Sequence, residues 1–155
     1  MPNWAYSVKE IDPERSVRCS GRELRISAKA ATEICRTIKG MRIEEAKKLL
    51  EAVISKKRPI AYRRYKKEVP HKSHSERWDA GRYPKKAATR ILGLLEELQS
   101  NAEYKGLDVD RLKIVHAASQ RGMKSRNYTP RAFGRSSPSF NTLTHIELIG
   151  YEAQA

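Results

Sequence analysis

The chain has 155 residues, which fits one domain over residues 1–155, and it has no apolar run near the ~18 residues that span a bilayer. A membrane protein is therefore excluded, and we see no targeting segment in residues 1–16. The formal net charge is +14, which favours a polyanionic partner.

The positive charge is concentrated in two segments. Residues 56–86 carry a net charge of +9 and residues 119–142 carry +5, whereas the rest of the chain is neutral when taken together. A basic helix face would spread its charge more evenly along the sequence. The distribution therefore predicts a nearly neutral body with two basic extensions.

Two amphipathic helices are expected in the first third of the chain. A short strand candidate, Glu23–Ile26, precedes Ser27, which stands at a plausible N-cap. Apolar residues then recur with helical spacing as far as Gly40, which can end the first helix. The second helix is expected to begin near Ile43 without a capping side chain, because Arg42 precedes it.

Helical periodicity disappears in a basic insertion at about residues 56–83. Tyr62, Tyr65 and Trp78 alternate there with Lys and Arg. Aromatic rings of this kind can stack on unpaired bases while the cations neutralise phosphates. The alternative is a solvated, partly flexible insertion. The RNA-binding candidates in and just after it are Lys56, Lys57, Arg58, Arg63, Arg64, Lys66, Lys67, Lys85 and Lys86.

The longest helix is expected to open with Pro84 at its first position and to end at Gly106. Two strands follow, Leu112–Ala118 and Leu143–Ile149. The expected fold is α+β, with three helices covering one face of a small, mostly antiparallel three-stranded sheet. A long protruding β-hairpin joins the last two strands.

The segment that joins these strands, residues 119–142, holds five basic residues and no acid. Three aromatic residues lie among them, so nucleic acid is the partner that fits this composition. We expect a hairpin whose ends belong to the sheet and whose middle needs a partner to become ordered. A disordered surface loop is the alternative. The binding candidates here are Arg121, Lys124, Arg126 and Tyr128.

No enzyme is predicted. The side chains considered for chemistry are Cys19, Cys35, His71, His74, His116 and His145. The two cysteines are expected to be reduced thiols, and the first two histidines lack the cysteine pairs of a zinc site. The last two histidines fall on paired strands, where a structural contact is favoured over a catalytic one. No cofactor, metal or small-molecule substrate is expected.

Several motifs together resemble one known family. They are Arg25–Ile34 with Ile38–Gly40, Pro84–Ala88, Ser100–Glu103, Gly106–Asp108, and Pro130–Arg135 followed by Thr144–Ile146. On these motifs residues 17–152 are similar to the large-subunit ribosomal protein twenty-two family. The basic insertion indicates the archaeal or eukaryotic branch of that family.

The resemblance implies a structural constituent of the large ribosomal subunit in the cytoplasm. It implies binding to large-subunit rRNA and neighbouring large-subunit proteins, with a hairpin that lines the nascent-peptide exit tunnel and supports subunit assembly and translation. The residues matching the tunnel-lining tip are Arg131, Ala132, Phe133, Gly134 and Arg135. A free-standing RNA-binding or RNA-chaperone module remains the alternative.

Overall fold

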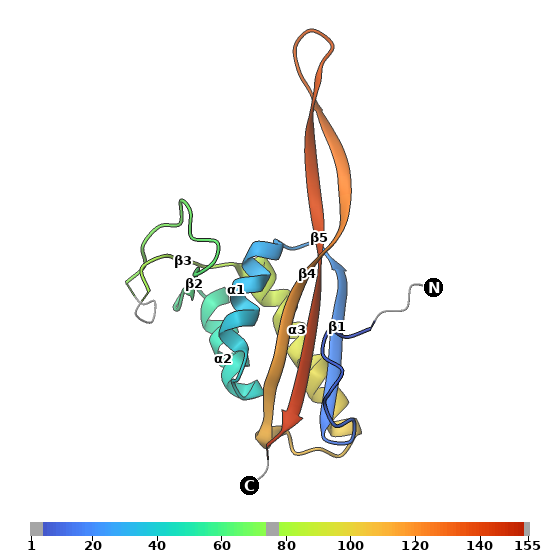
Figure 1. Cartoon of the computed structure of the whole chain (residues 1–155). Coiled ribbons are helices and arrows are strands. Elements are labelled where there is room, and N and C mark those ends of the chain that lie inside the picture. The colour runs from blue at the N-terminus through green and yellow to red at the C-terminus, as the bar shows by residue number, and fades with distance from the viewer. Residues whose placement is uncertain (1–4, 74–77, 154–155) are drawn as a thin grey trace.

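The computed structural model describes residues 5–73 and 78–153, so His74 lies outside the described residues. Its elements are β1 (Ser16–Leu24), α1 (Ala28–Ile38), α2 (Ile43–Ile54), β2 (Ile60–Ala61), β3 (Gly81–Arg82), α3 (Lys85–Tyr104), the 3₁₀ turn η1 (Val109–Arg111), β4 (Leu112–Pro130) and β5 (Ser136–Glu152). Helices α1, α2 and α3 lie on one face of the main sheet, and a hairpin rises far beyond the body (Figure 1). The expected α+β class is confirmed.

The main sheet is antiparallel, with strand order β1-β5-β4. Strand β5 is central and is buried from Thr144 to Gly150. Strand β1 runs from Ser16 to Leu24, so it shares only Glu23 and Leu24 with the predicted segment Glu23–Ile26, and the prediction placed the strand too late in the chain. The apolar signal in this stretch is weak, since β1 contributes Val17 and Cys19 to the buried core and Leu24 as a partly buried side chain packed against it.

The three helices fill the space behind the sheet with aliphatic side chains. Ile34 and Ile38 of α1, Leu50 of α2, and Leu95 and Leu98 of α3 are fully buried. Their burial at intervals of three or four residues is the amphipathic pattern that the sequence showed. The helix bodies are therefore confirmed.

The helix ends differ from the predictions in one place. Gly40 follows α1 with φ +89°, and its N–H donates to the carbonyl of Ile114 at 2.7 Å, which confirms it as the terminating residue. Arg42 is the N-cap of α2, as expected. Pro84 is the N-cap of α3 rather than its first residue. Proline suits both positions, since neither needs its N–H within the helix.

The hairpin is paired along its whole length. Strands β4 and β5 pair from Leu112 opposite Glu152 to Pro130 opposite Ser136, with two register shifts along the way. The middle that we expected to lie outside the ladder therefore belongs to it. Side-chain composition did not reveal this, because ladder hydrogen bonds satisfy the backbone without burying side chains. Near the end of the hairpin the rings of Tyr128 and Phe140 meet edge to face, with centroids 5.9 Å apart.

Two β-bulges flank the point where the hairpin leaves the body. One lies in β1 between Gly21 and Leu24, the other in β4 between Arg121 and Lys124. His145 of β5 lies between them, and its Nδ1 accepts the N–H of Glu23 at 2.9 Å. Bulges increase the local twist of a strand pair, so they set how the hairpin leaves the body.

The two strand histidines do not face each other. The register pairs His116 with Ile149, while His145 lies opposite Gln120. The predicted contact is therefore wrong. Pattern reading could not place the pair, because the register is fixed by where the hairpin turns: Pro130 pairs with Ser136, which puts His116 opposite Ile149 after one register shift.

The sheet face opposite the helices carries a polar cluster. Glu147 is buried, and its Oε2 accepts the N–H and the hydroxyl of Ser7 at 3.1 and 2.9 Å. The Ser7 hydroxyl also lies 3.0 Å from Nε2 of His116, whose pKa is lowered chiefly by burial. The N-terminal segment is thus fixed across this face of the sheet.

Replacing Gly122 with valine should destabilise the hairpin root. A Cβ there would stand 2.7 Å from Nε2 of the buried His145, so the ring must move. We expect the free energy of unfolding to fall by about 1–3 kcal/mol in urea denaturation. Gly93→Ala in α3 is the control, since its Cβ meets nothing within 4 Å, and it should gain about 0.5–1 kcal/mol. Equal effects from the two changes would contradict this account of the root.

Candidate nucleic-acid interface

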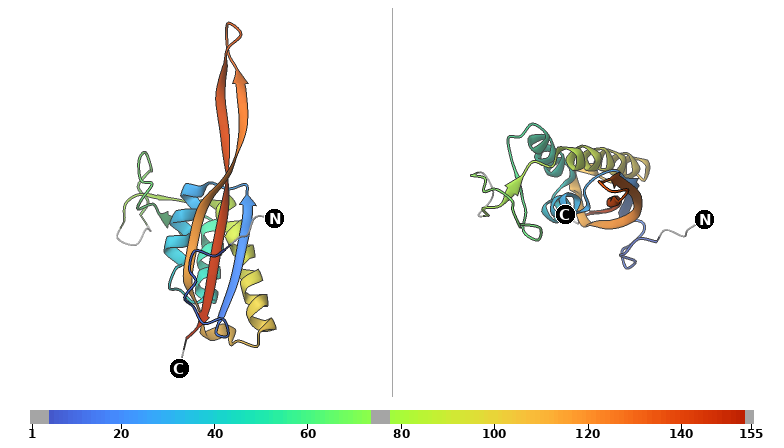
Figure 2. Two further views of the ribbon diagram at one scale, coloured as in Figure 1. Left: turned by 45° about the vertical axis from the view of Figure 1, so that its right-hand side comes forward. Right: turned by 90° about the horizontal axis from the view of Figure 1, so that it is seen from above.

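A groove lined by basic side chains, called the basic groove below, lies at the end of the body from which the hairpin rises. At this end α1 and α3 begin, as Figures 1 and 2 show. The groove has a volume of about 1190 Å³ and runs between these helix ends, the insertion and the hairpin root. Six basic side chains line it: Arg25, Lys29, Arg82, Lys85, Lys86 and Arg121.

Two helix N-termini open into the basic groove. Within the described chain, neither Ser27 nor Pro84 caps its helix with a side-chain hydrogen bond, and neither first turn holds an acid. The first N–H groups of a helix lack intrahelical partners and carry partial positive charge. Both helix ends therefore add to the attraction of the groove for phosphate.

A second hollow of about 400 Å³ continues the groove into the insertion. Arg64, Lys66 and Lys67 line it, and it shares Lys29 and Arg82 with the groove. The two basic extensions are thus not separate, since the insertion and the hairpin root form walls of one continuous basic surface. Of the predicted binding residues, this surface unites Arg64, Lys66, Lys67, Lys85, Lys86 and Arg121.

Glu33 of α1 holds the insertion in this position. Its side chain is buried, and Oε1 accepts the N–H groups of Arg64 at 2.8 Å and Tyr65 at 2.9 Å. Sequence reasoning missed this residue, because a helical carboxylate usually faces water. The sequence offered only a weak signal, which is that Glu33 directly precedes the apolar Ile34 and Cys35.

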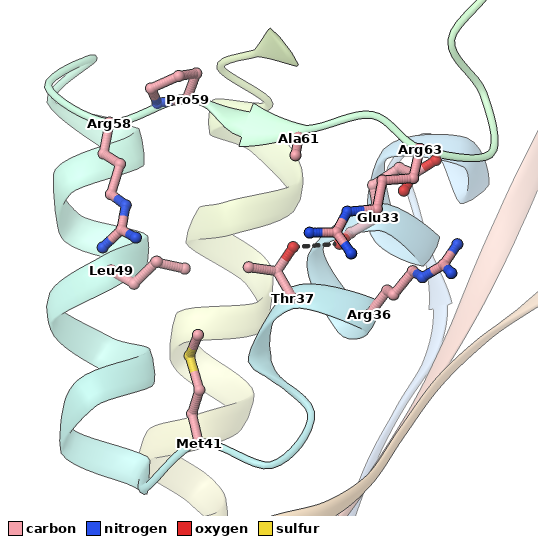
Figure 3. A pocket seen from close by; sticks show the side chains of 9 residues that line it. All are labelled: Glu33, Arg36, Thr37, Met41, Leu49, Arg58, Pro59, Ala61 and Arg63. Carbon is pink, nitrogen blue, oxygen red and sulfur yellow. Dashed lines mark hydrogen bonds between the residues drawn. The ribbon is translucent and has the colours of Figure 1, made fainter. Parts of the chain in front are cut away.

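A cavity of about 140 Å³ lies between the insertion, α1 and α2 (Figure 3). Leu49 and Met41 point into the space between the helices, and Arg63 and Thr37 line the same cavity. Arg58 lines the same cavity on the α2 side. These two predicted binding arginines therefore lie apart from the basic groove. Lys56 and Lys57 are exposed just beyond the end of α2.

The aromatic residues of the insertion are only partly available for stacking. Tyr62 is buried, which raises its pKa to about 12, and its carbonyl accepts the indole N–H of Trp78 at 2.9 Å. Tyr62 lines the groove but offers little ring surface for base stacking, because the residue is only 6% exposed. Tyr65 is half-buried, with the cations of Lys29 and Arg64 5.9 and 5.7 Å from its ring centre.

The cysteines and histidines form no reactive site within residues 5–73 and 78–153. Cys19 and Cys35 are free, buried thiols, and burial raises the pKa of each to about 12. His71 takes part in an isolated bridge with Ala80. The described residues contain no cluster of three metal-ligating side chains. Among the described helices, none is long and apolar enough to cross a bilayer.

The hairpin carries the remaining predicted residues. Lys124, Arg126 and Tyr128 are exposed along β4. The tip closes with the N–H of Arg131 donating to the carbonyl of Arg135 at 2.8 Å. Phe133, at φ +57°, is 95% exposed, so the apex presents a bare aromatic ring.

Glu33→Ala should release the insertion, because it leaves the N–H groups of Arg64 and Tyr65 without their acceptor. We expect about 2–4 kcal/mol less stability and faster tryptic cleavage within residues 56–67. Glu33→Gln is the matched variant, since its amide oxygen can still accept both bonds, and it should cost much less. Similar cleavage rates for the two variants would show that Glu33 does not hold the insertion.

Comparison with known proteins identifies the family to which this chain belongs. The family model for ribosomal protein L22p/L17e matches residues 19–150. Large ribosomal subunit protein uL22 of Archaeoglobus fulgidus is 51% identical, with 93% of each chain covered. The uL22 proteins of Thermofilum pendens (47%, covering 99% of this chain and 100% of theirs) and Methanopyrus kandleri (50%, 95% and 94%) are also similar. These archaeal relatives agree with the branch expected from the insertion, and the chain belongs to the ribosomal protein L22p/L17e family.

Proposed function

We propose that this protein is a structural constituent of the large ribosomal subunit, in the cytoplasm, and that it binds large-subunit rRNA as a single domain. Family membership supports the subunit, since the relatives are named as large-subunit proteins. The observation that carries rRNA binding is the basic groove, where six cationic side chains and two helix N-termini meet at the root of the hairpin. Phosphate contacts of this kind position a protein on RNA.

The hairpin supports a second part of the proposal, that its tip lines the nascent-peptide exit tunnel. A two-stranded ribbon is thin enough to pass between packed RNA elements. Its tip residues Arg131–Arg135 include no acid, and Phe133 is almost fully exposed. Nascent peptide is the partner proposed for the tip. Neighbouring large-subunit proteins are proposed for the parts of the body that RNA leaves free.

The alternative, an RNA chaperone acting off the ribosome, uses the same basic surfaces. Sedimentation separates the two, because a constituent of the subunit co-sediments with large subunits at moderate salt and a chaperone does not. The hairpin favours a constituent of the subunit, because its strands continue the central sheet of the core and so hold it in one direction, unlike a flexible tail.

The basic groove should set the salt dependence of RNA binding. We expect Lys29→Gln with Lys85→Gln and Arg121→Gln to reduce the log–log slope against salt by about 2–3, because three phosphate contacts are lost. Filter binding to large-subunit rRNA over a range of salt concentrations measures the slope.

The charge-matched control is Lys9→Gln with Lys48→Gln and Lys113→Gln, because none of these residues lines the groove. The control should keep a slope close to that of the unmodified protein. If both triple variants lowered the slope equally, binding would follow net charge and not the groove.

A further inference from the structure

Beyond the bulge at its root, the hairpin has two chemically different faces. Residues paired across the ladder share a face, and successive pairs alternate between faces. Three pairs form the basic–aromatic face: Lys124 with Thr142, Arg126 with Phe140, and Tyr128 with Pro138. The three intervening pairs form the hydroxyl–amide face: Ser125 with Asn141, Asn127 with Ser139, and Thr129 with Ser137.

The ring contact supports this division. Tyr128 and Phe140 belong to neighbouring pairs of the basic–aromatic face, and their rings meet at 5.9 Å. On the other face Arg131 Nε donates to Ser137 Oγ at 3.2 Å, so the tip side chain folds back along the hydroxyl–amide face. Five of the six side chains of that face are exposed, and Ser137 is half-buried.

The hydroxyl–amide face lacks what the common partners require. The six side chains from the pair Ser125 and Asn141 to the pair Thr129 and Ser137 include no cation for phosphates and no large apolar group to anchor a protein, although the guanidinium of Arg131 reaches Ser137 at the tip end. Each of its hydroxyl and amide groups both donates and accepts hydrogen bonds. Its side chains are also short, so the ribbon backbone can approach a surface closely.

The 2′-hydroxyls of double-stranded RNA match this chemistry. They too donate and accept, and they lie in the wide, shallow minor groove of the A-form helix. We propose that the hydroxyl–amide face docks in the minor groove of a double-stranded RNA segment and hydrogen-bonds its 2′-hydroxyls. The basic–aromatic face then meets the phosphates and unpaired bases of a second RNA segment. This inference rests on the proposed rRNA binding and gives the hairpin a distinct RNA partner on each side.

The test compares two duplexes of one sequence. One is RNA, and the other carries 2′-fluoro riboses, which keep the A-form shape but cannot donate a hydrogen bond. The unmodified protein should bind the RNA duplex about tenfold more tightly, since several hydrogen bonds of modest net strength depend on the hydroxyls. The combined variant Ser125→Ala, Asn127→Ala, Ser139→Ala and Asn141→Ala should bind the two duplexes equally, with an unchanged salt slope.

Threonine at the same four positions is the control for side-chain size. Threonine places a hydroxyl at all four positions, is larger than serine and about the size of asparagine, and suits a strand, so it should retain much of the preference for RNA. If small size alone mattered, the threonine variant would be impaired and the alanine variant would not, which would overturn the inference. Equal binding of both duplexes by the unmodified protein would also overturn it. Neither result would affect the proposed function, which fails only if the unmodified protein does not bind large-subunit rRNA.

Discussion

The hairpin continues two of the three strands of the core sheet, β4 and β5, and the rest of the structure depends on this continuity. Beyond its root the hairpin has no buried residue of its own, so packing within the hairpin cannot set its direction. The direction comes from β5, whose residues Thr144 to Gly150 are buried between β1 and β4. Thr144 Oγ1 donates to the carbonyl of Ile26 at 2.9 Å and fixes the strand just where it leaves the core.

The helix directions follow from the same arrangement and explain where the charge lies. Helices α1 and α3 begin at the hairpin end of the body, while α2 ends there. The positive ends of two helix dipoles therefore lie beside Lys29, Lys85 and Lys86, where they favour bound anions. Lys56 and Lys57 follow the C-terminus of α2, where their positive charge interacts favourably with the negative end of the helix dipole. The cationic side chains thus gather at the surface at this end of the body, and none of them has to be buried in the core.

The sequence predicts those features that have a strong local signal. The 3.6-residue spacing of large aliphatic side chains identified all three helices, and the acid-free composition of residues 119–142 identified the hairpin. Motifs spread over residues 17–152 identified the family. Of the binding candidates, the lysines next to Pro84 and the arginine at the hairpin root do line the basic groove.

Other features depend on contacts between distant residues, so local patterns could not show them. Glu33 holds residues that follow it by 31 and 32 positions, and Tyr62, which follows β2, is buried in the core that the helices form. Arg25, Lys29 and Arg82 join the groove through folding alone. The two hairpin faces depend on the bulge after Arg121, since one extra residue in β4 reverses which side chains share a face with β5.

The central claim is that the hairpin end of the molecule faces rRNA and the opposite end does not. Tethered hydroxyl-radical cleavage in reconstituted large subunits tests it directly, because both native thiols are buried and an introduced cysteine can be labelled selectively. One probe is placed at the hairpin root by Met123→Cys, at a position 61% exposed, and another at the end of α3 by Tyr104→Cys, at a position 94% exposed. Strong rRNA cleavage from the hairpin root with little from the end of α3 is the predicted result. Equal cleavage from both positions, or stronger cleavage from the end of α3, would contradict the account.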